Sequence, residues 1–180
     1  TDFGRAMWTD IEGRRRVWFL NGDLAALSRT RCIAIVLHYQ NRDDTRECIE
    51  QLLKQGPDVG ILLISNAESL DDIRELQRAF PRIVAVQSED NVGYAAANNF
   101  GLWVCRQSQA EFFWIVNPDI VVPEGYYQKL LTRGKSWPDH AFYASTIVPS
   151  HQPEKAIFCG GEVRLDQGAR PGHLHMGRPV

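Results

Sequence analysis

The sequence predicts an α/β fold, in which a mostly parallel sheet is flanked by helices on both faces in a single domain. Two observations support this prediction. The apolar runs at 32–37 and 61–64 are continuous rather than alternating, as is typical of buried parallel strands. Helical patterns separate such runs, and the connections between them are only a few residues long. The 180 residues, 44% of them hydrophobic, are enough to bury one core.

The individual elements follow from local patterns. Asn41, Asp43 and Asp44 offer N-caps for a helix that Gly56-Pro57 ends, and 69–72 has the form of a capping box that opens a second helix. Residues 93–105 are Ala-rich and helical, and Pro123 suits the first turn of a later helix. The predicted strands are 32–37, 61–64, 83–86, 112–116, 142–148 and 156–165.

Composition excludes several classes of protein. The net charge of −2 argues against a protein that wraps nucleic acid in a positive field. No apolar run approaches the roughly 20 residues of a membrane helix, and residues 1–16 do not resemble a signal peptide. The four cysteines, Cys32, Cys48, Cys105 and Cys159, form no C-x-x-C motif, and we interpret them as reduced thiols in a cytoplasmic protein.

The first 30 residues do not follow the strand–helix alternation. We expect residues 1–30 to be an extension or the remnant of an upstream segment, and residues 31–180 to be the ligand-binding domain. The run Arg14–Arg16, followed by an apolar stretch and Asn21-Gly22, is compatible with a small hairpin, and such a run is more often a solvated face than a binding site.

Polar residues follow each predicted strand, at the edge where parallel sheets bind ligands. The segments to inspect are 38–41, 65–69, 87–93 and 117–122. His38, Tyr39, Gln40 and Asn41 suit a planar base or sugar edge, although these residues taken alone favour a capped turn. Gly93 at a helix start lets backbone N–H groups approach a phosphate. Asn98 and Asn99 are costly inside a helix, so either a binding role or a locally satisfied pair explains them.

The fourth strand delivers Asp119 to the same edge through the turn Asn117-Pro118-Asp119. A hard carboxylate oxygen there could hold Mg²⁺ or Mn²⁺ on a diphosphate, with phosphate and water as the other ligands. The alternative is that Asp119 caps the helix expected near Pro123. The sequence leaves both interpretations open.

Several competing signatures are absent. No G-x-G-x-x-G follows the first strand, no G-x-S-x-G occurs, and Gly134-Lys135-Ser136 lacks the partner glycine of a P-loop because position 129 is lysine. His173-x-His175 lies in a Gly- and Pro-rich tail that is typical of a loop rather than of a metal site.

Taken in order, the motifs resemble the family 2 inverting glycosyltransferases of the GT-A fold, particularly their rhamnosyltransferase-like members. The resemblance spans about residues 32–165 and is most specific in 91–99 and 117–119. It implies a GT-A (Rossmann-like) domain that binds a nucleotide-diphospho-sugar, with Asp119 as the surviving carboxylate of the D-x-D metal element. The donor-binding residues that it implies are His38, Tyr39, Gln40, Asn41, Ser65, Asn66, Asn91, Gly93, Asn98, Asn117, Gly160 and Gly161.

The sequence departs from the family at three of these positions. Asn117 replaces the first acid of the D-x-D element, as is common in the rhamnosyltransferase-like branch. Gln40 stands where the family has the Asn of its Tyr-Asn turn, and Ser65 stands where it has an Asp that contacts the nucleotide base. The departure at Ser65 puts base selectivity in question.

An inverting transfer also needs a general base to deprotonate the acceptor hydroxyl. The downstream acids Glu162 and Asp166 have no recognisable setting, so we expect the base beyond residue 180 and interpret the chain as a truncated donor-binding half. A further carboxy-terminal region or a partner chain would then complete the site.

The sequence therefore favours a metal-assisted glycosyltransferase acting on an unidentified acceptor glycan or glycolipid in cell-surface polysaccharide or glycolipid synthesis. It would be cytoplasmic, with peripheral contact to the membrane left open. The alternative is a non-catalytic nucleotide-sugar-binding or assembly domain on the same fold, which Ser65 and the missing base favour.

Overall fold

The computed structural model describes residues 4–9, 13–67, 69–136, 143–157, 161–164 and 170–173. The chain divides into two compact units, Thr1–Lys129 and Leu130–Val180. The first unit is an α/β domain built on a six-stranded sheet, and the second contains a two-stranded sheet.

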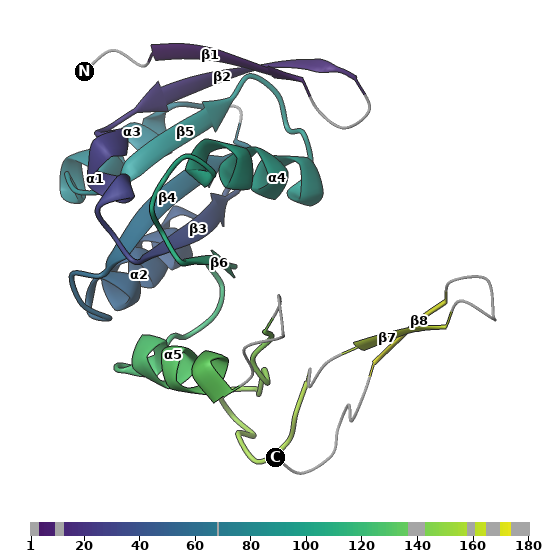
Figure 1. The fold of residues 1–180 in the computed structure, drawn as a ribbon. Helices are drawn as coiled ribbons and strands as arrows, with labels where there is room; N and C mark the ends of the chain where they lie inside the picture. The colour runs from purple at the N-terminus through teal and green to yellow at the C-terminus, as the bar shows by residue number, and fades with distance from the viewer. Residues whose placement is uncertain are drawn as a thin grey trace. The chain divides into compact units, whose positions relative to one another are not determined.

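Thirteen elements are described (Figure 1). The strands are β1 (Gly4–Thr9), β2 (Arg15–Asn21), β3 (Cys32–His38), β4 (Val59–Ser65), β5 (Val84–Ser88), β6 (Phe112–Val116), β7 (Gly161–Arg164) and β8 (Arg170–His173). The helices are α1 (Leu24–Ser28), α2 (Arg42–Leu53), α3 (Asp71–Ala79), α4 (Tyr94–Cys105) and α5 (Tyr126–Ser136). None of the described helices has the length and apolarity that a membrane span requires.

The large sheet has the strand order β1-β2-β5-β4-β3-β6. The strands β5, β4, β3 and β6 run parallel to one another, and β2 pairs antiparallel with β5. The predicted α/β fold with a mostly parallel sheet is therefore confirmed. The sheet is mixed only at the edge that the amino-terminal hairpin adds.

Helices cover both faces of the sheet (Figure 1). Because side chains alternate across a strand, Ile35 and Ile64 face α4, where they approach the backbone at Gly101. The next positions along β3 face the other way, and there His38 contacts Thr45 of α2. The β3 strand is buried along its whole length, as its continuous apolar run predicts.

Helix starts agree with the sequence in part. Asn41 is the N-cap of α2 and accepts a hydrogen bond from the backbone N–H of Asp44. The predicted capping box at 69–72 forms only in part. Ser69 Oγ accepts from the N–H of Asp71, whereas Leu70, the N-cap of α3, makes no side-chain cap. Asp72 instead lies 3.4 Å from His38 and 3.7 Å from Arg42, so this carboxylate faces basic groups rather than the helix start.

Two later predictions also need correction. Pro123 does not lie in a helix, because its carbonyl accepts from the N–H of Tyr126 in the turn before α5. Residues 143–148 form only an isolated bridge at Ile147, whose carbonyl accepts from Ile157 N, and Pro149 then offers no N–H to extend a ladder. Of the predicted strand 156–165, Ala156 and Ile157 are not in a strand, whereas 161–164 form β7.

The amino-terminal hairpin is joined to the core through an aromatic stack. Trp18 of β2 is fully buried, and its ring lies parallel to that of Phe100 in α4, with ring centroids 3.9 Å apart. Residues 15–21 thus form an additional strand of the sheet and pack on the helix that follows β5.

The three described cysteines are free and buried. Burial raises the pKa of each thiol, of Cys32, Cys48 and Cys105, to about 12. They behave as small apolar side chains, as predicted. Cys159 lies outside the described residues.

We expect Trp18→Ala to lower the free energy of unfolding by about 3–5 kcal/mol, because it removes a fully buried aromatic ring and leaves a cavity against Phe100. Urea unfolding followed by circular dichroism measures the change. The control is Met7→Ala on the same hairpin, where the side chain is 65% exposed and the cost should stay within about 0.5 kcal/mol. Equal stability of the two variants would contradict a structural role for the stack.

Candidate functional site

The topology brings four turns to one edge of the sheet. The strands β3, β4, β5 and β6 are parallel, so the turns at 39–41, 66–69, 89–93 and 117–119 all leave at their carboxyl ends. The chain adds β4 and β5 on one side of β3 and then returns to place β6 on its other side. This reversal between β3 and β6 is the switch point at which open α/β sheets form a ligand crevice.

His38 does not reach that edge as a ligand-facing side chain. Its ring is buried, with Nδ1 2.8 Å from Thr45 Oγ1 and Nε2 3.4 Å from Asp72 Oδ2. Burial lowers the pKa of His38, and the nearby Asp72 opposes that shift. His38 therefore supports the turn from beneath by linking β3 to α2 and α3.

The next three residues occupy the edge itself. Tyr39 is 48% exposed, and Gln40 has a positive φ of 62°, which is uncommon for a residue other than glycine. Asn41 caps α2, so the capped-turn interpretation holds for its side chain. Tyr39 and Gln40 remain available to contact a ligand.

The turn after β4 is tied to both neighbouring turns. The backbone N–H of Asn66 donates to the carbonyl of His38 at 3.0 Å, and Asn66 Nδ2 donates to the carbonyl of Gly93 at 3.2 Å. Ser65 is buried, and its hydroxyl accepts from the N–H of Ala67. Hence Asn66 couples the ends of β3 and β5, while Ser65 is occupied within its own turn.

The turn after β5 depends on a glycine. Asn91 Oδ1 accepts from the N–H of Gly93 at 2.9 Å, and Gly93 has φ 81° and ψ 169°, a region essentially restricted to glycine. The helix α4 begins directly afterwards at Tyr94 and makes no side-chain cap. Its first N–H groups therefore lie at the edge formed by the four turns.

Several buried polar atoms near this edge have no hydrogen-bond partner among the described residues. They are the side-chain oxygens of Asn66, Gln87, Ser88 and Asn98. Asn98 Nδ2 donates to the carbonyl of Tyr94, which satisfies only half of its amide. Buried polar atoms without partners cost about 1–3 kcal/mol each and commonly mark a functional site or bound water.

Gln87 and Ser88 fall in the segment 87–93 that the sequence singles out, but neither was named as a donor-binding residue. Both lie at the end of β5 and are buried, and Gln87 donates to the carbonyls of Ala67 and Ser88. A signal was available, because two polar residues end an otherwise apolar buried strand.

Asp119 lies in the turn after β6 and is exposed, as is Asn117. It does not cap α5, which begins only at Tyr126, so the capping interpretation is wrong. Val116, the last residue of β6, pairs with Val36 near the end of β3, so the turn that holds Asp119 leaves the sheet next to β3. The predicted turn thus lies beside the β3–α2 connection at the switch point.

The side chains that could act as metal ligands at this edge fit a cation only in part. Within the described ranges, no group of three or more His, Cys, Asp or Glu side chains could hold a metal ion. One hard carboxylate oxygen is nevertheless compatible with Mg²⁺ or Mn²⁺, which are commonly held by one or two carboxylates together with substrate phosphates and water. Asp119 is compatible with such a shared site.

The remaining predicted residues belong to the second unit. Gly160 lies outside the described residues, as do Asp166 and His175, and Gly161 is the first residue of β7. The structure therefore leaves the predicted role of Gly160 and Gly161 untested.

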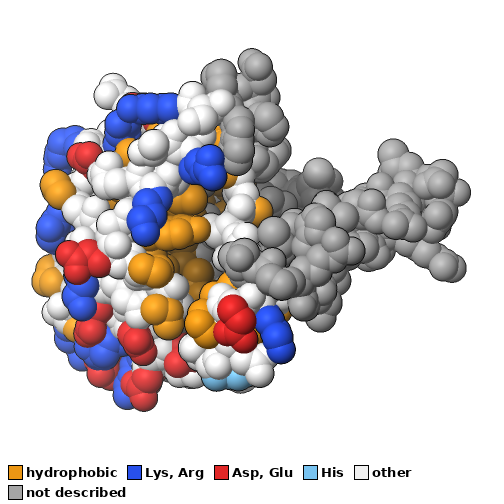
Figure 2. Space-filling view, turned by 90° about the horizontal axis from the view of Figure 1, so that it is seen from below, with side chains coloured by type: hydrophobic (Ala, Val, Ile, Leu, Met, Phe, Trp, Pro, Cys, Tyr) orange, Lys and Arg blue, Asp and Glu red, His pale blue; other side chains and the backbone are white. Residues whose placement is uncertain are grey.

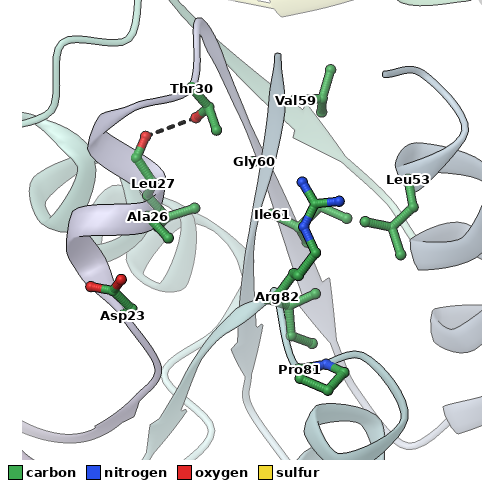
Figure 3. Close-up of a pocket in the computed structure, with 11 residues that line it drawn as sticks. Asp23, Ala26, Leu27, Thr30, Leu53, Val59, Gly60, Ile61, Pro81 and Arg82 are labelled. Carbon is green, nitrogen blue, oxygen red and sulfur yellow. Dashed lines mark hydrogen bonds between the residues drawn. The ribbon is translucent and has the colours of Figure 1, made fainter. Parts of the chain in front are cut away.

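A cavity of about 240 Å³ opens at the opposite edge of the sheet (Figure 3). Its lining includes Leu27 of α1, Thr30 just after that helix, Val59 at the start of β4, and Ile83 just before β5. Since the amino ends of the parallel strands lie there, this cavity is separate from the four turns.

We expect Gly93→Ala to lower the free energy of unfolding by about 1–3 kcal/mol, because any side chain at this φ and ψ strains the backbone. A Cβ atom at Gly93 would meet nothing within 4 Å, so the cost is conformational and not steric. Urea unfolding measures it, and the exposed Ala95→Ser should change stability by less than about 0.5 kcal/mol. A Gly93→Ala variant as stable as the unmodified chain would show that the turn does not require glycine.

No curated protein matches the chain significantly. Among solved structures, the chain is similar to the mannosyltransferase PcManGT from Pyrobaculum calidifontis in complex with GDP-Man and Mn²⁺, at 19% identity and a TM-score of 0.48. The match covers 63% of this chain and 33% of that one, so the chain spans about a third of its length. The model of glycosyl transferase family 2 matches residues 33–155, well over half of the sequence, and the chain belongs to this family.

Proposed function

We propose that the chain binds a nucleotide-diphospho-sugar and forms the donor-binding part of a glycosyltransferase that acts on an acceptor hydroxyl. The observation that carries the proposal is the convergence of four polar turns at the switch point between β3 and β6, in a member of glycosyl transferase family 2. Parallel sheets bind ligands outside the carboxyl ends of their strands at such a point.

The exposed groups at the edge have distinct roles in this proposal. Tyr39 and Gln40 offer an aromatic ring and an amide to the base or sugar edge. The backbone around Gly93, at the start of α4, offers N–H groups to a phosphate. Asn66 connects the turn after β4 to the turn after β5 through its bond to Gly93, and Asn98 bonds to the carbonyl of Tyr94 in the first turn of α4.

Asp119 would hold Mg²⁺ or Mn²⁺, and Asn117 stands where the first acid of the family's metal element is usual. The metal would supply stabilisation of the departing diphosphate. The support is the exposed carboxylate after β6, at the edge where a diphosphate would lie. The same Asn117-Pro118-Asp119 turn supports a rhamnosyltransferase-like donor, with the acceptor in a cell-surface polysaccharide or glycolipid.

An inverting transfer requires a general base that takes the proton of the acceptor hydroxyl. Neither Glu162 nor Asp166 lies in a motif that suits this role, so the proposal takes the base from outside residues 1–180. The proposal also assigns a cytoplasmic location, because the described cysteines are free thiols.

A second function is a non-catalytic nucleotide-sugar-binding or assembly domain. Ser65 favours it, because the family usually has an Asp here for the base, whereas this buried hydroxyl already accepts the N–H of Ala67. The exposed Asp119 favours the transferase, since a metal held there would also stabilise a departing diphosphate.

Isothermal calorimetry with UDP, dTDP and GDP, each with and without Mn²⁺, tests the donor site. We expect binding that depends on Mn²⁺, and we expect Asp119→Ala to weaken it by about tenfold or more, equivalent to about 1.4 kcal/mol. The loss follows from removing the one protein carboxylate proposed to hold the metal.

The matched control is Asp58→Ala, which removes an exposed carboxylate at the amino end of β4. It should leave nucleotide affinity unchanged. Absence of binding to all three nucleotides would contradict the donor site, and metal-independent binding that survives Asp119→Ala would favour the non-catalytic domain.

A further inference from the structure

Two glutamines at the carboxyl end of α2, Gln51 in its last turn and Gln55 just after the C-cap Lys54, hold the backbone of the segment that follows Asp119. The N–H of Val122 donates to Gln51 Oε1 at 2.6 Å, and the N–H of Tyr127 donates to Gln55 Oε1 at 3.0 Å. Gln55 Nε2 donates in turn to the carbonyl of Pro123 at 3.0 Å. Three hydrogen bonds thus join one helix to a segment that lies about 70 residues away in the sequence.

The contacts follow the helix in order. Gln51 lies in the last turn of α2, and Gln55 follows the C-cap Lys54 and donates back to the carbonyl of Gln51. Val116, at the end of β6, pairs with Val36 of β3, Val122 lies at Gln51, and Tyr127 lies at Gln55. The segment after β6 therefore runs along α2 from the level of the switch point toward the far end of the helix.

The amide of Gln55 is fully used in this arrangement. Gln55 is only 6% exposed, and its Nε2 also donates to the carbonyl of Gln51 at 3.1 Å. A buried glutamine at the end of an amphipathic helix is costly unless such bonds satisfy it. The bonds to Pro123 and Tyr127 explain why a glutamine, rather than a leucine, occupies this position.

The segment needs an external support because it has little regular structure of its own. Residues 117–125 lie between β6 and α5 and contain only turns and bends. The N–H of Val122 would otherwise need water or another acceptor. Asp119 is exposed, so its position depends on how the backbone around it is held.

We propose that Gln51 and Gln55 are positioning residues that clamp residues 119–127 to α2 and thereby set the place of the Asp119 carboxylate. The clamp itself stands on the hydrogen bonds above, and its consequence for ligand binding rests on the proposed function. Its effect on a metal–nucleotide complex is indirect, since neither amide is free to bind a ligand.

The first test needs no ligand. Residue-resolved amide hydrogen exchange, measured by NMR on the metal-free chain, should show Val122 exchanging about fivefold faster or more in Gln51→Met, which keeps the side-chain length and removes the acceptor. Gln51→Glu keeps an acceptor oxygen and should restore the protection. Lys54→Met, at an exposed position of the same helix end, should change nothing.

The amide of Ile35 in the buried strand β3 serves as the internal reference. Unchanged exchange at Val122 in Gln51→Met, or equal acceleration at Val122 and Ile35, would overturn the clamp, since the second result indicates global destabilisation. Gln55→Met applies the same test to Tyr127, and its comparison with Ile35 stays valid if that variant is less stable.

The second test asks what the clamp does for the carboxylate. Calorimetry with Mn²⁺ and the nucleotide that binds the unmodified chain should show about tenfold weaker binding in Gln51→Met, with metal-free nucleotide binding unchanged. A loosened segment with full metal-dependent affinity would overturn the positioning role. If the unmodified chain binds no nucleotide, the proposed function fails and the positioning role fails with it, while the exchange measurement still decides whether the clamp exists.

Discussion

The parallel pairing of β3 with both β4 and β6 is the constraint on which the rest of the structure depends. Because of this pairing, the chain leaves the same edge of the sheet after each of four strands. The strand order reverses between β3 and β6, and α2 and α4 lie on opposite faces of the sheet. A register shift of one residue in β3 would turn Ile35 away from α4 and turn His38 away from α2. The energy of the core and the location of the polar turns are therefore set by the same strand.

The two helices that border the switch point are supported in different ways. Apolar packing holds α4, through Phe100 against Trp18 and through Gly101 against the sheet. Polar contacts, from Gln51 and Gln55, connect α2 to the segment after β6. The apolar side chains of the edge strand β6 stay partly exposed, with Phe113 at 41% and Ile115 at 44%, and Figure 2, seen from below, shows apolar side chains at the surface among charged ones. The polar clamp thus acts where the sheet offers the least burial.

The alternation of apolar runs and helical patterns was sufficient to predict the fold, because each buried strand must be continuous in the sequence. The edge at which the turns meet followed from strand direction, so the placement of 39–41 and 117–119 could be foreseen. The burial of His38 could not be foreseen, because it depends on how α3 packs beside the end of β3. Gln51 and Gln55 left no signal, because a side-chain bond to a distant backbone requires no particular residue at the other end. Ser69 and Asp72 formed a local capping pattern of which only half is realised: Ser69 accepts from the N–H of Asp71, while Asp72 contacts His38 and Arg42 instead.

Paramagnetic broadening by Mn²⁺ tests the central claim, that the donor lies at the carboxyl edge beside Asp119, most directly. The amide signals of the chain would be recorded by NMR in the presence of a bound nucleoside diphosphate, with Mg²⁺ and then with trace Mn²⁺. The account predicts selective broadening at residues 39–41 and 117–119, with signals at 56–60, on the opposite edge, unaffected. Broadening centred on the cavity near Thr30 and Ile83, or spread evenly over the chain, would contradict it.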